Sequence, residues 1–350
     1  MSLKSLITAF LKLAISGLAI ASIGGLVLVL SDDGDVAEAQ ADLTNLHPAS
    51  VLQHGNFGRV MEESGLKAEP YDYNGNLVYF AHGESNLTPE ELADYFQKQF
   101  VRAGINSRVY DSADFTDLDP SELVPQYDSM EELLGNHLLP EQMEQGRARL
   151  NGEVVPMHSS PRSMMMSGII PHKKAQDGLE LVAQLEAQSD SRGVDLERRI
   201  NGFRFLEATY DERTGRSNLT ATWSDHGFDP KKISEPKANH SMELELPPCI
   251  GCDRTTRIAA LEREPFVVNQ FTTSAGTHNV VDFYRDTMPR RGWQTTANTD
   301  MMDEIAYHIP ELQNPTGEVV NFERDGHFIN IFVTQNPSTH RTSVISVMGQ

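Results

Sequence analysis

Two stretches of the sequence repeat each other at a distance of 188 residues. Residues 91–105 read ELADYFQKQFVRAGI, and residues 279–293 read NVVDFYRDTMPRRGW. Aspartate, arginine and glycine recur without a gap, and apolar residues recur with the i, i+3, i+4 and i+8 spacing of one face of an amphipathic helix. The repeat therefore predicts two similar structural units, each built around a helix with an aromatic buried face.

The ends of both helices can be located in the sequence. Thr88 with Glu91 three residues later matches a capping box, and Pro89 suits the first helical position. Gly104 and Gly292 end the two helices with a residue that tolerates positive φ. Pro289 has no counterpart in the first copy, so we expect the second helix to end early or to kink in its last turn.

Strand-like runs flank both helices and continue after them. They lie at 76–81 and 106–110 around the first helix, at 266–272 and 293–297 around the second, and further on at 203–211, 217–223, 318–324, 327–334 and 342–348. The turn Asp325-Gly326 between two such runs indicates a hairpin. The sequence predicts an α+β fold, in which an N-terminal transmembrane helix precedes two repeated β-α-β modules completed by antiparallel strands.

The second copy resembles a known module. Phe283-Tyr284-Arg285, Met288-Pro289 and Gly292-Trp293 are similar to a motif that recurs in secreted and membrane-anchored bacterial envelope proteins, most of them uncharacterised. The similarity covers about residues 266–348 and, less clearly, 76–225. The resemblance implies a fold and an envelope compartment, and it carries no catalytic residue.

The N-terminal segment has the features of a membrane anchor. Residues 13–30 carry no charge, and a helix of this length spans roughly 27 Å, close to the thickness of the hydrocarbon layer. Lys4 and Lys12 precede the run and acids follow it, so we expect a single pass through the cytoplasmic membrane with residues 31–350 in the periplasm. A cleaved signal peptide is the alternative. Gly17, Ala21 and Gly25 would line one side of the helix and permit close helix contact; chance is the alternative explanation.

The charge distribution bears on partners and on domain limits. The net charge is −21, and residues 31–150 hold 23 acidic and 7 basic residues. Such a body repels phosphate, which argues against nucleic-acid binding. We expect a membrane anchor at 1–31, a linker at 32–45, a first module at 46–240 with a long acidic insertion at roughly 111–200, a cysteine-containing connector at 241–265 and a second module at 266–350.

Cys249 and Cys252 are the only cysteines. Three roles fit a Cys-X-X-Cys pair: a structural disulfide, which an extracytoplasmic location favours; a thioredoxin-like redox site; and half of a metal site, for which only His240 lies near in sequence. The surrounding sequence lacks the βαβ pattern of thioredoxins, and Asp253 would oppose a thiolate. A disulfide is the preferred interpretation.

Two other segments contain possible metal ligands. Acids at 111–122 are dense enough to suggest Ca²⁺, but their spacing misses the EF-hand pattern, and a solvated acidic loop is preferred; they are Asp111, Asp114, Asp117, Asp119 and Glu122. His158, His172 and the methionines at 164–166 suit copper(I) by ligand type, yet three adjacent methionines cannot share one face of a strand. No cofactor is expected.

The sequence lacks the motifs of nucleophilic and phosphate-binding enzymes, and no enzyme activity is expected. The leading hypothesis is a single-pass membrane-anchored extracytoplasmic structural or interaction protein, a component or scaffold of an envelope assembly that binds a protein partner or its own copies. One alternative is a thiol-disulfide or metal-handling protein that uses Cys249 and Cys252. The other is a ligand-binding receptor with a cleft between its modules.

Overall fold

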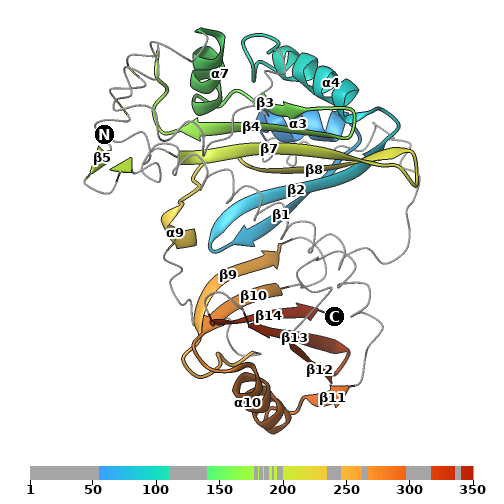
Figure 1. Cartoon of the computed structure of the whole chain (residues 1–350), viewed down its shortest axis with the longest axis vertical. Coiled ribbons are helices and arrows are strands. Elements are labelled where there is room, and N and C mark those ends of the chain that lie inside the picture. Colours follow the sequence, from blue (N-terminus) through green and yellow to red (C-terminus); the bar gives the residue numbers. More distant parts are fainter. Residues whose placement is uncertain are drawn as a thin grey trace. The chain divides into compact units, whose positions relative to one another are not determined.

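The computed structural model describes residues 55–110, 140–176, 200–234, 246–261, 267–296, 317–335 and 340–349, with short pieces between 180 and 194. The chain divides into two units. The described parts of 55–68 and 79–229 belong to unit 1, and those of 69–78 and 230–349 belong to unit 2, so the division passes through two strands, at 68/69 and at 78/79. Figure 1 shows that each unit combines strands with helices.

The elements of unit 1 are α3 (Gly55–Glu63), most of β2 (Asn76–Ser85), α4 (Pro89–Arg102), α7 (Pro140–Leu150), β3 (Val155–Ser159), β4 (Ser163–Pro171), β5 (Ser189–Asp190), β6 (Gly193–Val194), β7 (Ile200–Asp211) and β8 (Arg216–Ser224). Those of unit 2 are most of β1 (Lys67–Tyr73), α9 (Lys231–Ser234), β9 (Asp253–Ala260), β10 (Val267–Thr273), α10 (Thr277–Arg290), β11 (Gln294–Thr296), β12 (Glu318–Arg324), β13 (His327–Gln335) and β14 (Thr342–Gly349).

The strand order corrects the expected fold. Twelve strands follow one another in the order β11-β12-β13-β14-β10-β9-β1-β2-β8-β7-β4-β3, with antiparallel pairing. The expectation of two β-α-β modules is wrong, because such a module joins parallel strands of one sheet through its helix. Here the sheet is built from antiparallel neighbours, many of them joined by hairpins.

The first sequence copy departs from the expectation after its helix. The predicted strand at 106–110 is not a strand. Hydrogen bonds of side chains hold this segment in place instead of a strand ladder. The amide of Asn106 donates to the carbonyl oxygen of Val154 at 2.9 Å, and its oxygen accepts from the Val154 N–H at 2.8 Å. The Tyr110 N–H donates to the side-chain oxygen of Gln97 at 3.0 Å. These bonds attach residues 106–110 to α4 and to the start of β3 without a neighbouring strand.

The second sequence copy keeps its three elements, but they are not adjacent strands around a helix. In the strand order β10 and β11 are separated by β14, β13 and β12, and the short β11 pairs only with β12. Pro289 lies inside the last turn of α10, which continues to Arg290, so the expected early end is wrong. Gly292 follows with φ +87°, a conformation that favours glycine.

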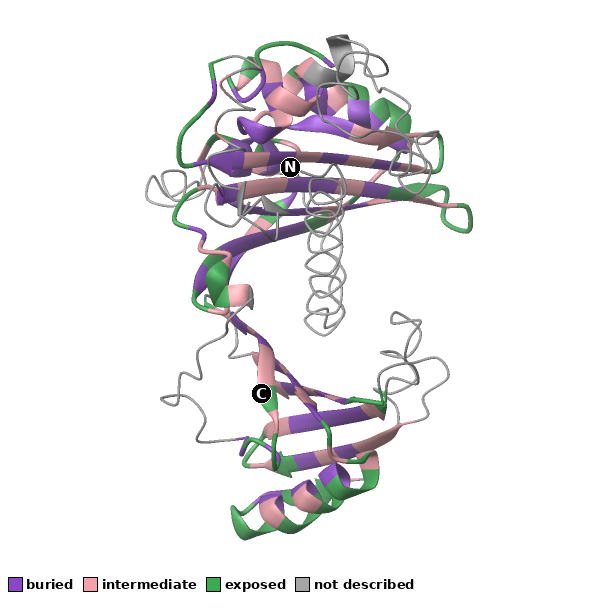
Figure 2. Cartoon of the chain, turned by 60° about the vertical axis from the view of Figure 1, so that its left-hand side comes forward, coloured by how far each residue is buried: buried purple, intermediate pink, exposed green. Residues whose placement is uncertain are grey.

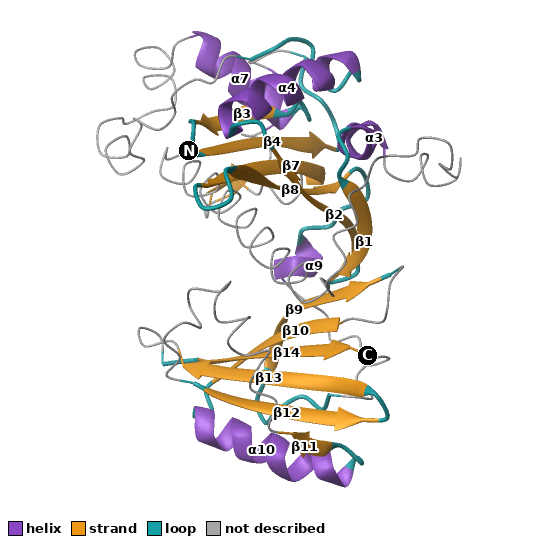
Figure 3. Ribbon diagram, turned by 90° about the vertical axis from the view of Figure 1, so that its right-hand side faces the viewer, coloured by secondary structure: helices purple, strands orange, loops and turns teal. Residues whose placement is uncertain are grey.

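In unit 1 the helices α3, α4 and α7 cover one face of the strands (Figure 3). The core contains aromatic contacts between helix and strand. Phe57 of α3 stacks on Phe100 of α4 with ring centroids 5.4 Å apart, and it meets the edge of Trp223 of β8 at the same distance. Arg204 of β7 points to this side and pairs with Asp225 at 3.2 Å, and both are mostly buried.

In unit 2 the helix α10 packs on one face of its strands. Val280, Val281, Tyr284 and Met288 of the helix are buried against apolar residues of β12, β13 and β14. Figure 2 shows the same pattern, with the buried residues of α10 toward the strands and the exposed ones on its outer side. The predicted aromatic buried face is therefore present, although Phe283 is only partly buried.

Two segments that were expected to lie outside the modules contribute strands. Residues 111–200, predicted as an insertion, contain β3 and β4, and β4 pairs along its length with β7. Residues 241–265, predicted as a connector, contain β9. The β3–β4 ladder has a register shift between Pro156 and His158, and β3 is the last strand in the order.

The expected transmembrane helix lies in a part of the chain that the structure does not describe. No helix among the described residues is long and apolar enough to cross a membrane. Residues 13–30, together with Gly17, Ala21 and Gly25, lie outside the described residues.

Candidate functional site

The cysteine pair forms the expected disulfide, which closes a tight turn before β9. Cys249 and Cys252 are bonded, with their Cα atoms 5.2 Å apart. The Cys252 N–H donates to the Cys249 carbonyl oxygen at 3.0 Å, as in a β-turn. Gly251 occupies the third position of this turn with φ +65°, where a side chain would be strained. The sequence Cys-Ile-Gly-Cys therefore suits both the turn and the bond.

The two sulfur-bearing residues differ in their surroundings. Cys249 is 4% exposed and belongs to the core cluster that includes Phe271, Val281 and Tyr284. Cys252 is partly buried at the edge of the same cluster. Ile250, between them, has 75% of its surface exposed. The turn thus inserts one cysteine into the core and presents an isoleucine to solvent.

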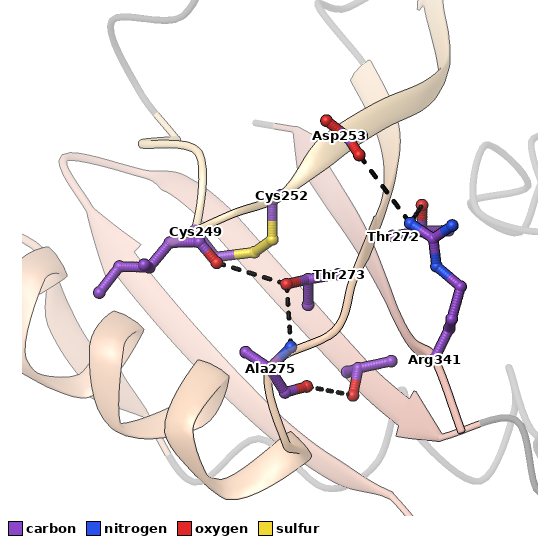
Figure 4. The surroundings of a disulfide bond; sticks show 9 residues. Cys249, Cys252, Asp253, Thr272, Thr273, Ala275 and Arg341 are labelled. Carbon is purple, nitrogen blue, oxygen red and sulfur yellow. Dashed lines mark hydrogen bonds and ion pairs between the residues drawn. A yellow bond between two sulfur atoms is a disulfide. The ribbon is translucent and has the colours of Figure 1, made fainter. Parts of the chain in front are cut away.

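A chain of hydrogen bonds connects the turn with the start of α10 (Figure 4). The Thr273 hydroxyl donates to the Ile250 carbonyl oxygen at 3.3 Å and accepts from the Ala275 N–H at 3.1 Å. The Ala275 carbonyl oxygen in turn accepts from the Thr342 hydroxyl at 2.6 Å. The disulfide turn, the end of β10 and the start of β14 are therefore fixed to one another at the N-terminus of the helix.

The charges near the disulfide do not favour thiol chemistry. Asp253 directly follows Cys252, and its carboxylate lies 3.9 Å from the guanidinium of Arg341. Burial raises the pKa of the Tyr284 hydroxyl, an effect that the adjacent Cys249 backbone opposes. A thiolate that attacked Cys252 would release the Cys249 sulfur as an anion among apolar side chains, which is unfavourable. The geometry is that of a structural disulfide.

The metal-ligand candidates are not brought together by the described structure. His240 and the acids Asp111, Asp114, Asp117, Asp119 and Glu122 lie outside the described residues. No group of three or more histidine, cysteine, aspartate or glutamate residues within the described ranges could hold a metal ion. Met164 and Met166 are buried on the helix-covered face of unit 1, whereas Met165 is half-buried on the other face.

One polar feature of unit 1 was missed by the sequence analysis. On the face opposite the helices, five residues lie in register across five strands: His158, Met165, Glu207, Thr220 and His82. Glu207 is at the centre of this row and is partly buried. Burial raises the pKa of its carboxyl group. Glu207 lies on the same face of β7 as Phe203 and Phe205, because alternate residues of a strand point to the same face. A carboxylate at alternate positions with two aromatic residues is the pattern by which the sequence analysis could have found it.

No family model, no curated protein and no solved structure matches the chain. The resemblance to the bacterial envelope module consequently stays a prediction.

Proposed function

We propose that this protein is an extracytoplasmic structural or interaction protein of a cell envelope, held at the membrane by its uncharged run 13–30. The observation that supports this best is the Cys249–Cys252 disulfide with one cysteine packed in the core of unit 2. Disulfides of this structural kind persist in oxidising compartments outside the cytoplasm.

A thiol-disulfide function would require other properties of Cys249 and Cys252. A catalytic pair needs an accessible sulfur with a stabilised thiolate, usually at a helix N-terminus or beside a cation. Here the turn leads into β9, Cys249 is buried, and the charged neighbour of Cys252 is the carboxylate of Asp253. These contacts favour the structural role over the catalytic one.

Two measurements on the full chain test the proposal. Thiol titration of protein isolated without reductant should find no free thiols, before or after exposure to a small dithiol at low concentration. Extraction of membranes with a mild detergent, followed by purification through a C-terminal tag, should retain a stoichiometric envelope partner or further copies of the chain. Free or rapidly reduced thiols, or recovery of the chain without a membrane and without a partner, would overturn the proposal.

A further inference from the structure

A bulge in β3 places two successive side chains of that strand opposite one residue of β4. Pro156 pairs in register with Met166, and the next pair is His158 with Met165, so Met157 and His158 together oppose Met165. In a β-bulge the extra residue is unpaired, and the bulge re-aims side chains relative to the regular alternation of a strand. Met157 and His158 can therefore lie on the same face of the sheet.

Contacts with β4 show where these side chains point. Ser163, Met165 and Ser167 are alternate residues of β4 and lie on one face. The Ser167 hydroxyl donates to the Met157 Sδ atom at 2.9 Å, and the Nε2 atom of His158 lies 2.9 Å from the Ser163 hydroxyl. The sulfur and the imidazole ring thus lie on the two sides of Met165 along the strand. All three side chains are half-buried and remain accessible to solvent.

This arrangement answers the objection that three adjacent methionines cannot share one face. Met164 and Met166 are 2% and 0% exposed and belong to the core of unit 1. Met165 keeps the accessible face, and a second thioether comes from Met157, which the sequence analysis did not consider. The Cβ atoms of residues paired across an antiparallel ladder are about 4.5–5.5 Å apart, a separation that one ion bound to Met165 and His158 can bridge.

The donor atoms select the kind of ion. Thioether sulfur is a soft, uncharged ligand that favours copper(I), and imidazole nitrogen also suits copper. A metal-binding histidine usually donates its other ring N–H to a neighbouring group, which fixes the orientation of the ring. With the proton on Nε2, His158 donates to Ser163 and presents the Nδ1 lone pair to the ion. Methionine has three rotatable side-chain bonds, so both sulfur atoms can adjust to the ion.

We propose that Met157, His158 and Met165 form a copper(I) site with two thioether ligands and one imidazole ligand. The ion binds to neutral donors, without a change of oxidation state and without transfer of a group. Unlike thiols, thioethers form no disulfides, so this ligand set is compatible with an oxidising compartment. The inference goes beyond the proposed interaction role and rests on the contacts between β3 and β4 alone.

The test is competition for copper(I) between the full chain in mild detergent and a coloured copper(I) chelator, in the absence of oxygen. The wild type should take up at least one ion per chain. Met157→Leu, Met165→Leu and His158→Gln should each weaken binding by about tenfold or more, because each removes one ligand. Met164→Leu, at a core position of β4, is the matched control and should change the affinity less than about twofold, since it conserves volume.

A second measurement identifies the side chains that bind. Silver(I), an air-stable ion with the same charge and a similar preference for sulfur, is added to protein labelled with ¹³C at the methionine methyl groups. The methyl signals of Met157 and Met165 should shift, and that of Met164 should stay in place. Each signal is assigned by its loss in the corresponding leucine variant.

The cysteines are the main competing ligands, because thiolates also bind copper(I) when a reductant opens the disulfide. The Cys249→Ser, Cys252→Ser variant should bind copper(I) with unchanged affinity. Loss of binding in that variant would overturn the proposal, as would unchanged binding in Met157→Leu and Met165→Leu or methyl shifts confined to other methionines. Failure of the proposed function is distinct, since it would be seen as free thiols or the lack of an envelope partner.

Discussion

The helices α4 and α10 occupy equivalent places in the sequence repeat, yet their N-termini are held in different ways. Thr88 caps α4 with a complete capping box: its hydroxyl accepts from the Glu91 N–H, and the Glu91 carboxylate accepts from the Thr88 N–H at 2.8 Å. Gly276 starts α10 and makes no side-chain cap. Its neighbours are held instead by Thr273, Thr342 and the disulfide turn. One helix start is encoded within four residues, and the other depends on tertiary contacts.

The largest expected effect concerns the buried aromatic face that each of the two helices has. Phe96 of α4 is 1% exposed and stacks on Phe100. Phe96→Ala should lower the free energy of unfolding by about 3–5 kcal/mol, because it leaves a cavity in an aromatic core. Denaturant unfolding followed by circular dichroism measures this loss, with Asp94→Ala as the exposed control on the same helix. A loss below about 1 kcal/mol would contradict the packing described for unit 1.

The next effect concerns the tertiary support of α10. Thr273 is 1% exposed, and its hydroxyl joins Ile250 to Ala275. Thr273→Val should cost about 1–3 kcal/mol, because the partly buried Ala275 N–H loses its acceptor. Thr295→Val, at an exposed position of β11, is the matched control and should be nearly neutral. Hydrogen exchange should locate the change in the first turn of α10.

The disulfide should increase the loss of stability that Thr273→Val causes. If the bond holds the Ile250 carbonyl in place, the penalty of Thr273→Val should be smaller in the Cys249→Ser, Cys252→Ser background. The double cysteine variant itself should still fold, because the bond closes only a short loop and stabilises by less than the usual ~2–4 kcal/mol. Equal penalties in both backgrounds would show that the turn and the helix start are independent.

The local cap of α4 should contribute less. Thr88→Ala removes the capping box and should lower stability by about 1 kcal/mol. Amide exchange of residues 90–92 measures the fraying that accompanies this loss. The protection of α10 should not change, since its start is held by other residues.

The smallest effect would make the two helix starts alike. Gly276→Asp should stabilise α10 by a few tenths of a kcal/mol, because it supplies an N-cap oxygen and a negative charge at the helix start. Gly276 has φ −67°, and a Cβ atom there would meet no atom within 4 Å. Thermal unfolding at low ionic strength should detect the gain, and a decrease in stability would show that the backbone requires glycine.

The parts of the fold that depend on neighbouring residues could be predicted from the sequence, and those that depend on long-range contacts could not. The helix at 88–104 and the hairpin at Asp325-Gly326 rest on neighbouring residues, and both are confirmed by α4 and by β12–β13. Strand pairing is long-range, so the ladder of β4 with β7 and the role of Asn106 had no local signal. The β-α-β interpretation was wrong because Asn106 takes the place of a second strand in the first copy, and β10 and β11 are not neighbours in the second.

The candidate site shows the same division. The disulfide could be predicted because two cysteines with a glycine between them form a local turn. Glu207 could not, because its position beside Met165 and Thr220 depends on pairing among strands far apart in sequence. A carboxylate within a strand becomes informative only when the neighbouring strands are known.

The register shift in β3 has a consequence for the behaviour of the protein in solution. A terminal strand offers unpaired backbone groups to which a strand of another chain can add. In β3 such pairing is hindered by Pro156, which lacks an N–H, and by the bulge beside it. At the other end of the order β11 is only three residues long. Both ends of the described strand order are thus poor templates for the addition of strands from other copies of the chain.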